Sequence, residues 1–130
     1  MGMSVEISSE LLGRIRAEAA ASPEREICGL LTGNDRAITG AIPAANVAPD
    51  PSGHFEIDPA TLFVALRAER AGGARVIGHY HSHPNGRCEP SMHDAANAEP
   101  GKLWLIAAAG EIGLWRSSEQ GFGQVELTVG

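Results

Sequence analysis

One short stretch of the chain, GHYHSHPNGRCEPSMHD at residues 78–94, gathers side chains that bind metals or move protons. His81 and His83 are separated by one residue, so on a β-strand they point to the same face, about 6.6 Å apart along the strand. Two imidazoles on one face can bind one metal ion. Asp94 is a candidate third ligand, because the intervening prolines and glycine let the chain turn back. Two histidines and a carboxylate that leave a fourth position open form a catalytic zinc set.

Parts of this stretch also have purely structural interpretations. An isolated H-x-H pair is a weak signal, and Ser91 with Asp94 matches the S-x-x-D outline of a helix capping box, in which MHDAANA would form the first helical turns. Cys88 is either a spectator or a ligand, whereas Cys28 is interpreted as a small core residue. The complete pattern H-S-H-P-x6-S-x2-D is far more specific than any of its parts.

Composition limits the classes of protein to which the chain can belong. Its 130 residues, 43% of them hydrophobic, predict one globular domain over residues 1–130. The formal net charge of -6 argues against a nucleic-acid-binding surface or an anionic membrane surface. Neither a signal pattern nor an apolar run of membrane-spanning length is present, so a cytoplasmic protein without membrane contact is expected.

Elements that could position the cluster follow from hydrophobic periodicity and breaker residues. A helix capped by Ser8 or Ser9 should stop before Pro23, and a second should begin at Pro59, end at Gly72-Gly73 and carry Leu62, Phe63, Ala65 and Leu66 on one side. Strands are predicted at 27–33, 36–43, 74–83, 102–109, 111–116 and 123–129, with Gly110 turning a hairpin. This order predicts an α/β fold, a single-domain mixed β-sheet with helices packed on it.

The chain resembles the JAMM (MPN-plus) metalloprotease family, as a small prokaryotic member. Residues 81–94 match its signature, and PEREICGLLTG at 23–33 resembles its upstream segment, where a glutamate precedes C-G-L-L-x-G. Asn46 and HFEIDP at 54–59 fit its middle section, and VIGHYHSHP at 76–84 fits the strand that delivers the ligands. The resemblance implies the MPN/JAMM fold, which is cytidine-deaminase-like.

The resemblance also implies a role for each matching residue. His81, His83 and Asp94 would bind Zn²⁺, Glu26 would be the general acid/base, and Ser91 would help to bind the oxyanion. Glu26 is preferred to its neighbour Glu24 because it directly precedes the apolar strand. The remaining histidines are not expected to be ligands: His79 occupies a position where the family often has an aromatic residue and is expected to pack, and His54 and His93 are expected at the surface.

The implied function is zinc-dependent hydrolysis of a peptide or isopeptide bond. Small prokaryotic members of the family are associated with the C-terminal tails of ubiquitin-like sulfur-carrier proteins, so such a protein is the expected substrate. Two alternatives remain: a non-catalytic MPN-type scaffold for protein contacts, and a RadC-like domain, which shares the H-x-H-P-x-G core. The intact set of polar residues favours the enzyme over the scaffold.

Overall fold

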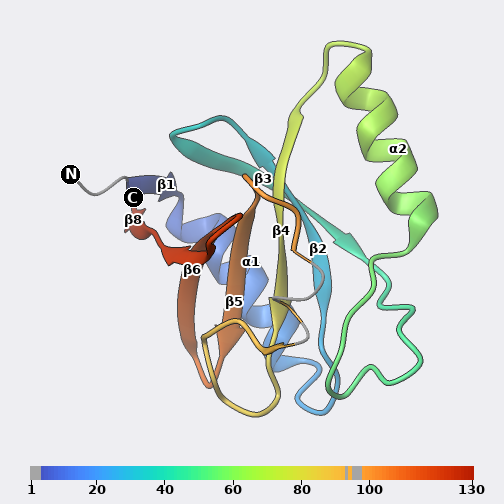
Figure 1. Cartoon of the computed structure of the whole chain (residues 1–130), viewed down its shortest axis with the longest axis vertical. Coiled ribbons are helices and arrows are strands. Elements are labelled where there is room, and N and C mark those ends of the chain that lie inside the picture. The colour runs from blue at the N-terminus through green and yellow to red at the C-terminus, as the bar shows by residue number, and fades with distance from the viewer. Residues whose placement is uncertain (1–3, 93, 95–97) are drawn as a thin grey trace.

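A computed structural model describes residues 4–92, 94 and 98–130 of the chain. Within this part of the chain the order of elements is β1 (Ser4–Ile7), α1 (Ser9–Ala20), β2 (Cys28–Gly33), β3 (Ala37–Ala44), α2 (Pro59–Arg70), β4 (Arg75–Ser82), β5 (Leu103–Ala108), β6 (Glu111–Ser118), β7 (Gly121–Gln124) and β8 (Glu126–Val129). The described strands form one sheet in the order β7-β6-β5-β4-β2-β3-β1-β8 (Figure 1). Because β4 runs parallel to β5 but antiparallel to β2, the predicted mixed sheet is confirmed.

Local sequence signals set the ends of both helices. The Ser8 hydroxyl accepts a hydrogen bond from Leu11 N at 3.1 Å, which caps α1. Asp58 caps α2 through Ala60 N at 3.4 Å, and Pro59 takes the first helical position, where its missing N–H costs nothing. Both helix starts therefore agree with the sequence.

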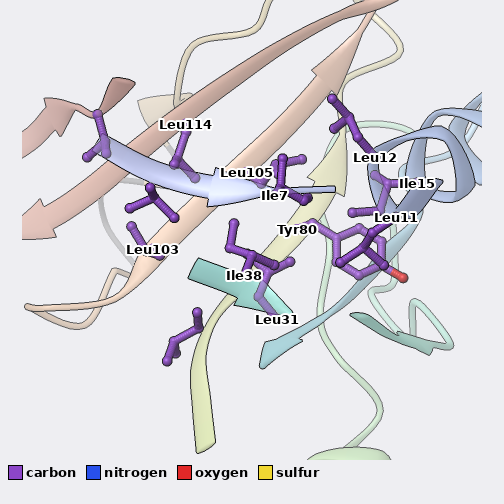
Figure 2. Close-up of a cluster of buried hydrophobic side chains, with 13 residues drawn as sticks. Ile7, Leu11, Leu12, Ile15, Leu31, Ile38, Tyr80, Leu103, Leu105 and Leu114 are labelled. Carbon is purple, nitrogen blue, oxygen red and sulfur yellow. The ribbon is translucent and has the colours of Figure 1, made fainter. Parts of the chain in front are cut away.

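Helix α1 packs on one face of the sheet and forms the larger core with it. In Figure 1 it passes behind β4 and β5, and Figure 2 shows its Leu11, Leu12 and Ile15 next to Tyr80. The Tyr80 side chain is fully buried, and its hydroxyl donates to Glu18 Oε1 of α1 at 2.9 Å. Alternation along β4 places His79 and His81 on the face opposite Tyr80, so the candidate metal ligands lie away from this core.

Helix α2 packs on the smaller core of Leu30, Ala65 and Val76, with Leu62 and Leu66 partly buried against it. The expectation that Phe63 shares this side is wrong, since Phe63 is 58% exposed. Phe63 follows Leu62 by one residue, which is a rotation of roughly 100° around a helix, and the packed stripe is too narrow to include both.

The strands after residue 102 include the predicted hairpin, but the last predicted strand is divided. Ala109 (φ 50°) and Gly110 (φ 80°) form the two-residue turn that joins β5 to β6, as expected of a hairpin with positive φ at both positions. The segment predicted as one strand at 123–129 is instead divided. Gln124 pairs with β6, Val125 N donates to Leu114 O at 2.9 Å, and the chain then pairs with β1 as β8.

Candidate metal centre

The two histidines of the H-x-H pair meet Asp94 at the end of β4. Their Nε2 atoms lie 2.9 Å apart, and Asp94 Oδ2 lies 3.3 Å from His81 Nε2 and 3.1 Å from His83 Nε2. All three side chains are buried, with exposed fractions of 0%, 5% and 3% for His81, His83 and Asp94. Three potential metal-binding atoms therefore form a small triangle inside the protein.

The size of this triangle fits a transition-metal ion. Ligand atoms about 2.0–2.1 Å from a tetrahedral zinc ion are separated by about 3.3 Å. The observed edges of 2.9–3.3 Å lie close to that value. Nitrogen and carboxylate donors are also the types that zinc accepts in catalytic sites. The donor set thus fits zinc by geometry and by chemistry.

Neighbouring groups fix how the two imidazoles present their Nε2 atoms. His83 Nδ1 lies 2.7 Å from the carbonyl oxygen of Arg87 and donates to it, which leaves the Nε2 lone pair free for a metal. The His81 ring stacks on Phe55, with centroids 4.2 Å apart and planes inclined by 20°. Neither Phe55 nor the Arg87 carbonyl was identified as part of the site from sequence, because no pattern assigns a partner to a particular ring nitrogen.

A helix cap orients Asp94. Ser91 N donates to Asp94 Oδ2 at 2.8 Å, and Asp94 N donates to Ser91 Oγ at 3.0 Å, which is the reciprocal arrangement of a capping box. The same Asp94 oxygen faces both histidines, so the structural and ligand interpretations of this residue are compatible. The continuation of the predicted helix over His93 and residues 95–97 lies outside the described residues, as does the expected exposure of His93.

The charge states of Asp94 and His81 suit metal binding, whereas the hydrogen bonds of His83 with Asp94 and with the Arg87 carbonyl raise the pKa of His83 despite its burial. Burial works against the charged form of Asp94, but the close contacts of its carboxylate with the His81 and His83 rings hold its pKa well below the usual range. Burial lowers the pKa of His81. An ionised aspartate beside a neutral imidazole is the state that metal binding requires, since ligands must be deprotonated.

Glu26 lies beside the two histidines although it is far from them in sequence. One carboxylate oxygen of Glu26 and one ring nitrogen each of His81 and His83 all lie within 4.8 Å of one another. The Glu26 side chain is buried, and burial raises its pKa to about 7. Its Oε1 has no hydrogen-bond partner among residues 4–92, 94 and 98–130. Glu24 is exposed, so the two glutamates occupy different environments, as the sequence interpretation required.

The remaining candidates lie near the cluster without joining it. His79 packs edge-on against Trp104 with centroids 4.8 Å apart, and burial lowers its pKa to about 4. Cys88 directs its thiol to Ala108 O at 3.5 Å, and Cys28 is fully buried in the core. His54, expected at the surface, is half-buried with its Nδ1 enclosed, because the segment that carries it folds back against the sheet.

The two roles suggested for Ser91 predict different results for Ser91→Ala. As an oxyanion donor, its loss should lower kcat by roughly 10² to 10³. As a cap alone, its loss should cost about 1 kcal/mol of unfolding free energy and leave turnover unchanged. We expect both effects, measured by steady-state kinetics and by thermal denaturation. Normal turnover with a lower Tm would mean that Ser91 acts only as a helix cap.

Comparison with known proteins identifies the family. The Prok-JAB family, described as prokaryotic homologs of the JAB domain, matches residues 8–118. The chain belongs to this family. The JAMM (MPN-plus) resemblance is confirmed, and with it the prediction of an enzyme. The match favours the hydrolase over the RadC-like alternative.

Similar proteins include two with curated names. The desampylase of Haloferax volcanii is 34% identical over 111 residues, which cover 83% of this chain and 80% of the relative. A probable TtuB-protein conjugate cleaving protease of Thermus thermophilus is 34% identical over 97 residues, covering 75% and 65% of the two chains. A JAB1/MPN domain protein from Archaeoglobus fulgidus shares the fold, with a TM-score of 0.66, 24% identity and 99% of both chains covered. The predicted MPN/JAMM fold class is thereby confirmed.

Proposed function

We propose that this protein is a zinc-dependent hydrolase of peptide or isopeptide bonds, with His81, His83 and Asp94 as the metal ligands. The observation that carries the proposal is the buried triangle of two Nε2 atoms and one Oδ2 atom beside the Glu26 carboxylate. A zinc ion held there would supply a Lewis acid that activates water near neutral pH.

Glu26 is suited to move the proton. In hydrolysis the water oxygen adds to the carbonyl carbon, the water proton passes to the Glu26 carboxylate, and the C–N bond then breaks as Glu26 delivers the proton to the leaving nitrogen. A pKa near 7 lets one carboxyl group accept and return a proton at neutral pH. The Ser91 hydroxyl uses its oxygen to accept from Asp94 N, so its proton is available to the developing oxyanion.

A pocket next to the site offers room for substrate. It has a volume of about 500 Å³ and extends from Asp94 past His79 and Trp104 towards α2. Most of its wall is apolar and includes Leu30, Phe55, Ile57, Leu62 and Leu66. An apolar wall of this kind is better suited to bind the apolar side chains of an extended peptide than to bind the charged surface of a folded protein.

We propose that the substrate is a ubiquitin-like carrier protein whose C-terminal tail bears a covalent adduct. Two relatives support this choice, since one is named a desampylase and the other a protease that cleaves TtuB-protein conjugates. A tail that ends in glycine lets the scissile carbonyl approach the buried cluster closely, because glycine has no side chain.

The two free thiols, Cys28 and Cys88, agree with a reducing compartment such as the cytoplasm. No described helix is long and apolar enough to cross a membrane.

The substrate proposal predicts that the tail dominates recognition. We expect the zinc-loaded protein to release the adduct from a ubiquitin-like carrier with a glycine-ended tail, and to lose most of that activity when the last tail residues are made bulky. Gel-based hydrolysis with both carriers measures the preference. Equal cleavage of unrelated peptides would contradict the proposed substrate, and a zinc-free, inactive protein would indicate the scaffold alternative.

A further inference from the structure

Asn46 uses the whole hydrogen-bonding capacity of its side chain next to Glu26. Its Nδ2 donates to Glu26 O at 2.9 Å and to His54 O at 3.0 Å. Its Oδ1 accepts from Ala48 N at 3.0 Å and from Glu56 N at 3.1 Å. An asparagine amide has two N–H donors and two acceptor lone pairs, so all four are occupied.

The backbone of Glu26 is held on both sides of its Cα atom. Glu26 N donates to Pro51 O at 2.7 Å, and Glu26 O accepts from Asn46. The next residue is fixed too, because Ile27 N donates to Ser82 Oγ at 2.9 Å and Ile27 O accepts from Ser82 N at 3.1 Å. Ser82 is the last residue of β4 and lies between the two candidate ligand histidines, so these bonds tie Glu26 to the end of β4.

The segment that holds Glu26 also forms a wall of the substrate-sized pocket. Two backbone bonds reach Glu26 from residues 46–57, one from Pro51 O and one through the Asn46 amide. The same segment lines the pocket with Ala48, Pro49, His54, Phe55, Glu56 and Ile57. The planar side-chain amide of Asn46 therefore connects the pocket wall to the backbone of Glu26.

We propose that Asn46 is a positioning residue that sets the location of the Glu26 carboxylate relative to the metal ligands and couples it to the pocket wall. The inference rests on the proposed function, in which Glu26 transfers the proton. A reacting group must be held near its productive geometry, and a displacement of about 1 Å can cost a factor of 10² in rate. Without the Nδ2 donor, the Glu26 carbonyl loses its bond to the pocket wall.

The substitution Asn46→Asp tests this role with little change of shape. An aspartate keeps the acceptor for Ala48 N and Glu56 N but has no N–H for Glu26 O. Asn34→Asp is the matched control, since Asn34 Oδ1 also accepts two backbone N–H groups, from Arg36 and Ala37, in an exposed turn. Asn46→Ser, which is uncharged and has one shorter hydroxyl in place of the amide, separates loss of the Asn46 hydrogen bonds from the added charge.

We expect Asn46→Asp and Asn46→Ser to lower kcat by about 10- to 100-fold, with KM and zinc content near the wild-type values. Asn34→Asp should leave kcat unchanged. In a Glu26→Gln background, Asn46→Asp should have less than about a twofold further effect, because residues that act through one group are not additive. A full additive loss, or a loss of zinc that accounts for the lower kcat, would overturn the positioning role.

Amide hydrogen exchange of the metal-free protein gives a readout that does not depend on activity. Asn46→Asp should speed exchange of the Glu26 and Ile27 amides, and Asn34→Asp should not. Unchanged exchange at both amides would overturn the proposed link. Wild-type protein that hydrolyses nothing would instead refute the proposed function, while the exchange measurement would still decide whether Asn46 holds Glu26.

Discussion

The Glu26→Gln variant is expected to lose a factor of about 10² to 10⁴ in kcat while it keeps its fold and its zinc. Glutamine has nearly the same shape as glutamate, but its amide cannot take a proton from water and return it to a leaving amine. The side chain is buried, and its carboxylate lies within 4.8 Å of ring nitrogens of His81 and His83, so no exposed carboxylate can replace it. Steady-state kinetics on a carrier–adduct substrate, with zinc measured on the same sample, checks this result.

Glu24→Gln is the matched control for this variant. Glu24 is two residues away, has the same side chain and is exposed to solvent. Its substitution should change kcat by less than about twofold, as exposed substitutions usually have small effects. Equal losses in the two variants, or no loss in either, would remove Glu26 from the mechanism.

His83→Ala is expected to weaken zinc binding by more than about 100-fold. Loss of an outer partner of a metal ligand already costs 10- to 100-fold in affinity, and loss of the ligand itself should cost more. The substitution removes one of the three donor atoms and leaves Asp94 Oδ2 and His81 Nε2, which lie 3.3 Å apart, as a pair. Competition with a chromophoric zinc chelator measures the change in affinity.

His79→Phe is the control that removes a histidine from β4, the strand that also carries His81, without removing a donor of the triangle. Phenylalanine can keep the edge-on contact with Trp104. Zinc affinity should remain near the wild-type value. If His79→Phe weakened binding as much as His83→Ala, or if His83→Ala bound zinc as tightly as the wild type, the proposed ligand set would be wrong.

Sequence patterns are sufficient to predict a helix or strand whose surroundings are the same along its whole length. β5 has every side chain buried, and both helices begin at the expected caps. They fail where an element changes partner or is only partly covered. The strand predicted at 123–129 divides at Val125 because β6 and β1 take successive parts of it, and α2 covers too little of the sheet to bury Phe63.

The candidate site was predictable to the extent that its residues share a motif. His81, His83, Ser91 and Asp94 lie within fourteen positions of one another, and the family resemblance added Glu26. The positions of Phe55 and Asn46 against the cluster depend on how residues 46–57 fold back, which involves backbone carbonyls that carry no sequence signal. In the sequence Asn46 is only a match to the family pattern, and its four hydrogen bonds are a property of the fold.

The pairing of β2 with β4 has a consequence for the order of events during folding. It places Cys28 opposite His81 and joins Ile27 to Ser82, two residues that are 55 positions apart. Contacts over such separations form late, since the entropy of closing the loop must be offset first. The hairpin of β2 and β3 can form while the chain is still being synthesised, but Glu26 meets the histidines only after β4 has emerged and paired. A partly made chain that lacks β4 therefore has no assembled cluster of Glu26, His81 and His83.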